Sequence, residues 1–130
     1  MKLLLLILAG LGAVALVACG GGPTQIEKGK LVTGTITASD ASVDDWASQP
    51  YVVDVLKGVE YFIRLTSPDG NILGVWSADG DDNIVNVDAE LTARTSAHTF
   101  SESGPQELYI RSPDSDVPSA FTFKIWAPSS

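Results

Sequence analysis

Cysteine and histidine are almost absent from this sequence of 130 residues, which contains one of each, Cys19 and His98. A single thiol cannot close an intrachain disulfide or build a thiolate metal site. The sequence also has no nucleophile-elbow motif, so a Ser-His-Asp centre lacks support and His98 fits a structural or surface residue better. Paired carboxylates remain as catalytic candidates, and these could hydrolyse a glycoside.

Basic residues are scarce too, with 8 Lys and Arg against 16 Asp and Glu and a formal net charge of −8. An acidic domain is repelled by nucleic-acid phosphates and by anionic lipid surfaces. We therefore expect no nucleic-acid partner. The length is that of one domain with one hydrophobic core.

Long apolar runs are missing except at the N-terminus, where Leu3 to Val17 follows the basic residue Lys2. A basic start and an apolar run of this length are typical of a secretory signal. A transmembrane helix is one alternative, but it needs roughly 20 apolar residues. Cleavage after Ala13-Val14-Ala15 by a conventional peptidase is another.

Leu16-Val17-Ala18-Cys19 resembles the bacterial lipobox. The resemblance implies that a signal peptidase cuts before Cys19 and that this residue carries a lipid anchor. We therefore expect a signal peptide over 1–18, a lipidated Gly-rich tether over 19–29 and a folded domain over 30–127. Gly20 stands where inner-membrane retention signals have Asp, which indicates the outer membrane if the envelope is Gram-negative.

Short runs of β-branched and aromatic residues, cut by turn residues, fill the chain from Lys30 onward. About eight such runs at roughly ten-residue spacing predict an all-β fold, an antiparallel β-sandwich with a jelly-roll-like arrangement. Ser39 to Pro50 reads as a polar loop. Alternation predicts a core that includes Val53, Val55, Ile63, Leu65, Leu108, Ile110, Phe121 and Phe123.

The order of these signals resembles the bacterial pre-peptidase C-terminal domain. The resemblance rests on Asp44-Asp45-Trp46 before an alternating strand, Lys57-Gly58, Tyr61 to Leu65, Ala78-Asp79-Gly80, Leu108 to Arg111 and Phe121 to Ile125. It covers about Lys30 to Ala127 and implies a β-sandwich. Members are mainly non-catalytic accessory modules, some of which bind calcium or assist binding of protein or polysaccharide. Ala47 to Pro50 separates the acidic pair from its strand more than the family pattern does.

Two sets of residues are candidates for binding. Asp79, Asp81, Asp82 and Asp88 could offer oxygen ligands to calcium, although this stretch lacks the spacing of an EF-hand and also fits a solvated acidic turn. Trp46 and Trp126 could stack on a ligand, because the first lies in the predicted loop and the second points away from the Phe121, Phe123 and Ile125 face. Core or edge packing is the alternative for both tryptophans.

Together these features predict a lipid-anchored protein of the bacterial cell envelope that acts as a non-catalytic binding or structural accessory module. The membrane is the expected partner of the anchor, and an envelope protein or polysaccharide that of the domain. A glycan-binding module and a small hydrolase using carboxylates are the alternatives.

Overall fold

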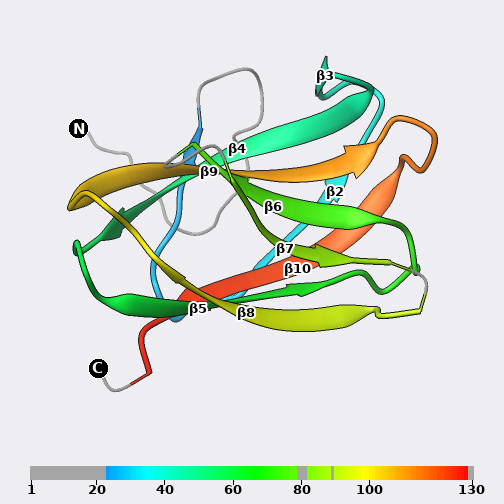
Figure 1. Cartoon of the computed structure of the whole chain (residues 1–130). Helices are drawn as coiled ribbons and strands as arrows, with labels where there is room; N and C mark the ends of the chain where they lie inside the picture. Colours follow the sequence, from blue (N-terminus) through cyan, green and yellow to red (C-terminus); the bar gives the residue numbers. More distant parts are fainter. Residues whose placement is uncertain (1–22, 79–81, 89, 129–130) are drawn as a thin grey trace, which may run out of the picture.

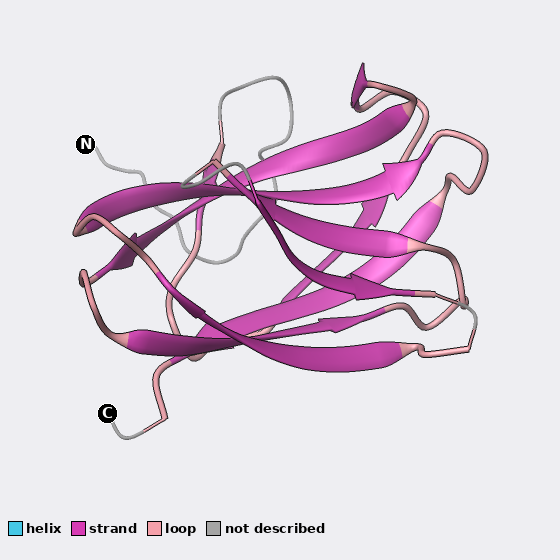
Figure 2. Ribbon diagram, in the orientation of Figure 1, coloured by secondary structure: helices cyan, strands magenta, loops and turns pink. Residues whose placement is uncertain are grey.

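The computed structural model describes residues 23–78, 82–88 and 90–128. Every regular element among them is a β-strand, as Figure 2 shows, and none of them lies in a helix that could cross a membrane. Cys19, Asp79 and Asp81 lie outside the described residues. The all-β prediction is confirmed for the domain.

Ten strands form two sheets packed face to face, with β4, β9 and β6 above β10, β5 and β8 in Figure 1. The six-stranded sheet has the order β1-β4-β9-β6-β7, with β3 added against β4, and the four-stranded sheet has the order β2-β10-β5-β8. The strands are β1 (Thr24–Gln25), β2 (Val32–Ile36), β3 (Ala41–Val43), β4 (Trp46–Val55), β5 (Glu60–Thr66), β6 (Leu73–Ser77), β7 (Asp82–Val87), β8 (Ala93–Thr99), β9 (Gly104–Pro113) and β10 (Ser119–Trp126).

The eight strands other than β1 and β3 follow the jelly-roll arrangement. They pair antiparallel as nested partners, β2 with β10, β4 with β9, β5 with β8 and β6 with β7. This is one long hairpin folded over into two sheets, which joins strands far apart in the sequence. The jelly-roll prediction is therefore confirmed, and two short strands beyond the expected eight are added to it.

The core lies between the sheets and is built by strict alternation along the long strands. In β10, Phe121, Phe123 and Ile125 are fully buried while their neighbours are half-buried. All eight core residues predicted from the sequence are 3% exposed or less. Burial of each such side chain contributes about 1.5–3 kcal/mol, which makes this layer the main source of stability.

The segment predicted as a polar loop over Ser39 to Pro50 is instead mostly a β-hairpin. Strand β3 pairs with the first residues of β4, and Asp44 and Asp45 form the two-residue turn with φ of 54° and 69°. Positive φ at both central residues is typical of a type I′ turn, which Asp tolerates better than most residues. The alternation of apolar residues is weak here because β3 is exposed throughout.

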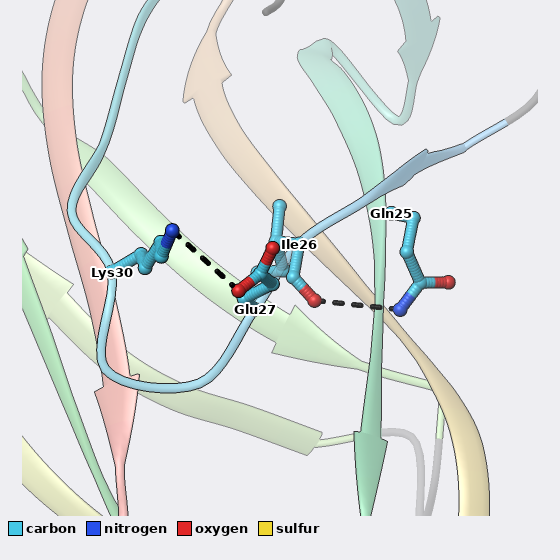
Figure 3. A network of polar contacts seen from close by, with 4 residues as sticks. All are labelled: Gln25, Ile26, Glu27 and Lys30. Atoms are coloured by element: carbon cyan, nitrogen blue, oxygen red, sulfur yellow. Dashed lines mark hydrogen bonds and ion pairs between the residues drawn. The ribbon is translucent and has the colours of Figure 1, made fainter. Parts of the chain in front are cut away.

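The predicted tether over 19–29 differs from the structure from Thr24 onward. Thr24 and Gln25 pair in parallel with β4, and Ile26 is buried in the core at 8% exposed. Figure 3 shows the polar contacts that follow, in which Gln25 Nε2 donates to the Ile26 carbonyl and Lys30 Nζ lies 3.7 Å from Glu27 Oε1. The sandwich therefore includes residues that the Gly-rich composition assigned to a linker.

Candidate functional site

All three tryptophans of the chain lie on the outer faces of the sandwich. Trp46 is in β4, Trp76 in β6 and Trp126 in β10, and each is half-buried beside a fully buried strand neighbour. The buried core among the described residues is filled by Phe, Tyr, Leu, Ile and Val instead. Large aromatic area is thus left partly in water, where it is available to a ligand.

The outer face of the six-stranded sheet carries two of these tryptophans around strand β9. Trp76 lies directly opposite Tyr109, with ring centroids 5.3 Å apart and planes tilted by 53°. The Arg111 guanidinium lies 5.1 Å from the centre of the Trp46 ring. Because Tyr109 and Arg111 are two residues apart on β9, they join both contacts on one face. We call Trp46, Trp76, Tyr109 and Arg111 the aromatic face.

A carboxylate fixes the tyrosine of this face. The Tyr109 hydroxyl donates a hydrogen bond of 2.5 Å to Glu107 Oε1. This hydrogen bond, followed by burial and by the charge of Glu107, raises the pKa of Tyr109. The phenol therefore stays neutral and its ring is held in place near physiological pH.

Glycine at position 74 leaves room for the Asn86 side chain on the aromatic face, between Arg111 and β7. Gly74 pairs with Arg111 on one side and with Asn86 on the other. Asn86 Oδ1 would lie 2.6 Å from a Cβ at this position, so the amide lies over the glycine. The Asn86 amide thus lies beside the aromatic rings, and a residue larger than glycine at position 74 would displace it.

The outer face of the four-stranded sheet carries the third tryptophan. Trp126 lies opposite Phe62, with ring centroids 5.8 Å apart, and Lys124 Nζ lies 5.3 Å from the centre of the Trp126 ring. Beside them, Arg64 Nη1 donates a 3.2 Å hydrogen bond to Thr95 Oγ1. A pocket of about 480 Å³ opens next to Trp126, with Lys28 and Val59 in its wall.

The structure thus separates the two tryptophans that the sequence singled out. Trp46 lies in strand β4 rather than in a loop, and it is on the opposite face of the sandwich from Trp126. Sequence reasoning missed Trp76, Tyr109 and Arg111 as companions of Trp46. The alternation Leu108-Tyr109-Ile110-Arg111 gave their side of β9, but it could not identify β4 and β6 as the neighbours of this strand.

Of the four acidic candidates for calcium, Asp88 is the one whose side chain the structure describes. Within 23–78, 82–88 and 90–128, no three side chains of the metal-ligating types cluster. Asp88 Oδ1 already accepts hydrogen bonds from the backbone N–H groups of Glu90 and Leu91, each at 3.0 Å. This carboxylate therefore has a structural use in the turn, and calcium binding stays a prediction.

The one histidine belongs to the packing of the sandwich. The His98 ring in β8 lies edge-on to Phe100, with ring centroids 4.6 Å apart and planes at 81°. Phe100 is itself buried against Tyr61. These contacts agree with the structural role that the sequence favoured for His98.

No protein-family model matches the chain, and the curated proteins searched contain no match. Among solved structures, the pre-peptidase C-terminal domain of a collagenase from Bacillus anthracis is 12% identical, with a TM-score of 0.61 over 82% of this chain and 96% of that one. PliG from Aeromonas hydrophila, a periplasmic inhibitor of g-type lysozyme, is also 12% identical, with a TM-score of 0.48 over 80% of this chain and 97% of that one. The domain is an antiparallel β-sandwich with the fold of a pre-peptidase C-terminal domain.

Proposed function

We propose that this protein is a non-catalytic binding module, held at the bacterial envelope by a lipid on Cys19, which binds a neutral polysaccharide on its aromatic face. The observation that carries the proposal is the outward placement of Trp46 and Trp76 around Tyr109 and Arg111. Trp, Tyr and Arg are the residues that dominate binding energy at recognition surfaces. Trp46 and Trp76 are each half-buried, so part of each ring stays accessible to a partner.

A sheet face suits a sugar chain because it is broad and because its rings are already held. The Trp76–Tyr109 and Arg111–Trp46 contacts fix the ring positions before binding, which reduces the entropy lost on complex formation. Asn86 and Ser48 lie on the same face and can form hydrogen bonds to sugar hydroxyls. The shared fold with an appended domain of a collagenase supports an accessory rather than a catalytic role.

The binding test uses the full chain in detergent on an array of neutral glycans. We expect Trp46→Ala to weaken binding about 30-fold, since truncation of a central aromatic costs about 2 kcal/mol. Trp126→Ala is the matched control on the opposite face and should leave neutral-glycan binding unchanged. Equal loss in both variants, or capture of an envelope protein that survives Trp46→Ala, would contradict the proposal.

Turnover and anchoring need separate tests. A general hydrolase screen of the same protein should show no turnover, and activity abolished by changing one Asp or Glu in a folded variant would contradict the non-catalytic role. Fractionation should place the wild type with membranes and Cys19→Ala with soluble proteins. Release of both as soluble protein would remove the lipid anchor from the proposal.

A further inference from the structure

The outer face of the four-stranded sheet is ordered into three rows that run across the strands. Strand register places Trp126 opposite Phe62 in an aromatic row and Lys124 opposite Arg64 in a basic row. It also places Thr122 between Thr33 and Thr66 in a hydroxyl row. Successive rows are two residues apart along the strands, which is about 6.8 Å.

The basic row is an unfavourable arrangement for folding alone. Lys124 and Arg64 are directly opposite on the same face, where side chains start about 4.5–5.5 Å apart and like charges destabilise the pair. Among the residues that the structure describes, the only ion pair joins Lys30 to Glu27, so neither cation is neutralised by an acid. Two cations placed together in a chain of net charge −8 indicate a local site for an anion.

The neighbours of the basic row are suited to a sugar rather than to a simple ion. On one side, Lys124 already lies over the Trp126 ring, so charge and aromatic surface are adjacent. On the other side, the threonine hydroxyls can donate and accept hydrogen bonds. Glu60 is the acid on this face of β5, and it lies two residues beyond Phe62, with the aromatic row between it and the cations.

We propose that this face binds an anionic polysaccharide built from uronic acids. Its carboxylates would pair with Arg64 and Lys124, its rings would stack on Trp126 and Phe62, and its hydroxyls would reach the hydroxyl row. The planar guanidinium of Arg64 matches a carboxylate in a bidentate manner. The pocket beside Trp126 lies past the aromatic row, and its wall carries one cation, Lys28, and one acid, Glu60.

Charge favours this ligand over an anionic membrane. Screening at physiological salt limits electrostatic interactions to about 8 Å, so one sugar carboxylate responds mainly to the local cation pair. A membrane surface would meet a whole domain that is acidic, since the chain has 16 acids against 8 bases and one of those bases, Lys2, lies in the predicted signal peptide. The proposal goes beyond the function proposed above, because it concerns the opposite face and a charged ligand.

The experiment measures binding of the full chain in detergent to polygalacturonate, with a calcium chelator present to exclude metal bridging. We expect binding that weakens with added salt and that is lost when the carboxylates are methyl-esterified. Arg64→Gln combined with Lys124→Gln should weaken binding by about tenfold or more. Its melting temperature should stay equal or rise, because the like-charge pair is relieved.

Lys57→Gln, which removes an exposed cation in the turn between β4 and β5, is the control, and it should leave binding of polygalacturonate unchanged. Absence of binding to both polygalacturonate and alginate would overturn the inference, as would equal binding of the methyl ester. Binding to phosphatidylglycerol vesicles instead, lost in the double variant, would overturn it in favour of a membrane. Loss of neutral-glycan binding in Trp46→Ala bears only on the aromatic face, so the two proposals fail separately.

Discussion

Gly34 in β2 lies directly opposite Phe121 in β10, and the Phe121 ring fills the space of the missing side chain. A Cβ on Gly34 would lie 2.7 Å from Phe121 Cζ and 3.0 Å from Cε2. Phe121 is fully buried and meets Tyr51 edge-on, with centroids 6.3 Å apart. The ring is therefore enclosed by its neighbours, and the glycine is part of core packing between the two sheets.

Gly34→Ala should destabilise the domain by about 1–3 kcal/mol, because it overpacks a core that cannot relax. Urea unfolding of the full chain in detergent measures the change. Adding Phe121→Leu provides the check, since the smaller side chain makes room for the methyl group and the two changes should be strongly non-additive. If the urea midpoint of Gly34→Ala equals that of the wild type, this account of the packing is wrong.

The hairpin turn offers a stabilising substitution. Asp44 and Asp45 both have positive φ, which strains residues with a Cβ, so Asn-Gly in their place should raise the free energy of unfolding by about 0.5–1 kcal/mol. The Asp45 carbonyl that accepts the Asp114 N–H at 2.8 Å is kept in the variant. Asp45→Ala should instead lower stability, and an equal effect of both changes would argue against a strained turn.

Tyr51 should make stability fall at high pH. Burial, followed by the negative charge of Asp40, raises the pKa of Tyr51 to about 12. Since the unfolded value is about 10, the folded state holds the proton more tightly. The contribution of this pKa shift to the free energy of unfolding is complete below about pH 10 and is lost as pH rises toward 12.

Unfolding of wild type and Tyr51→Phe at several pH values tests this. The variant loses the 2.8 Å hydrogen bond from the Tyr51 hydroxyl to Gln49 Oε1 and should be less stable at pH 8. The free energy of unfolding of the variant should then decline less than that of the wild type between pH 10 and 12. The difference in stability between the two proteins should therefore become smaller. Parallel curves would show that Tyr51 does not titrate in this manner.

Asp88 allows calcium binding to be separated from turn structure. Asp88→Asn keeps an oxygen that can accept the Glu90 and Leu91 N–H groups, but it removes the charge. If the predicted site exists, calcium should raise the melting temperature of the wild type relative to chelator, and this gain should shrink in the variant. If the wild type has the same melting temperature in calcium and in chelator, Asp88 has only its structural role in the turn.

Much of the fold of this protein follows from the two-residue alternation of side chains along its β-strands. Alternation along Phe121-Thr122-Phe123-Lys124-Ile125-Trp126 assigned the core and correctly turned Trp126 outward, because successive strand residues point to opposite faces. Alternation failed over Ser39 to Pro50, where β3 is exposed on both sides. It also failed at Thr24–Gln25, whose strand is too short to show a pattern and exists only through pairing with β4.

The membership of each face was decided by the tertiary structure. Nesting of β2 through β10 places β9 between β4 and β6, so that Tyr109 and Arg111 join Trp46 and Trp76, which come much earlier in the sequence. It also sets Lys124 against Arg64, two cations that nothing in the local sequence pairs. The sequence determined which side of each strand a residue occupies, since that depends on local geometry. Which residues share a surface depended on strand order, because hydrogen bonds between strands join segments that are distant in the chain.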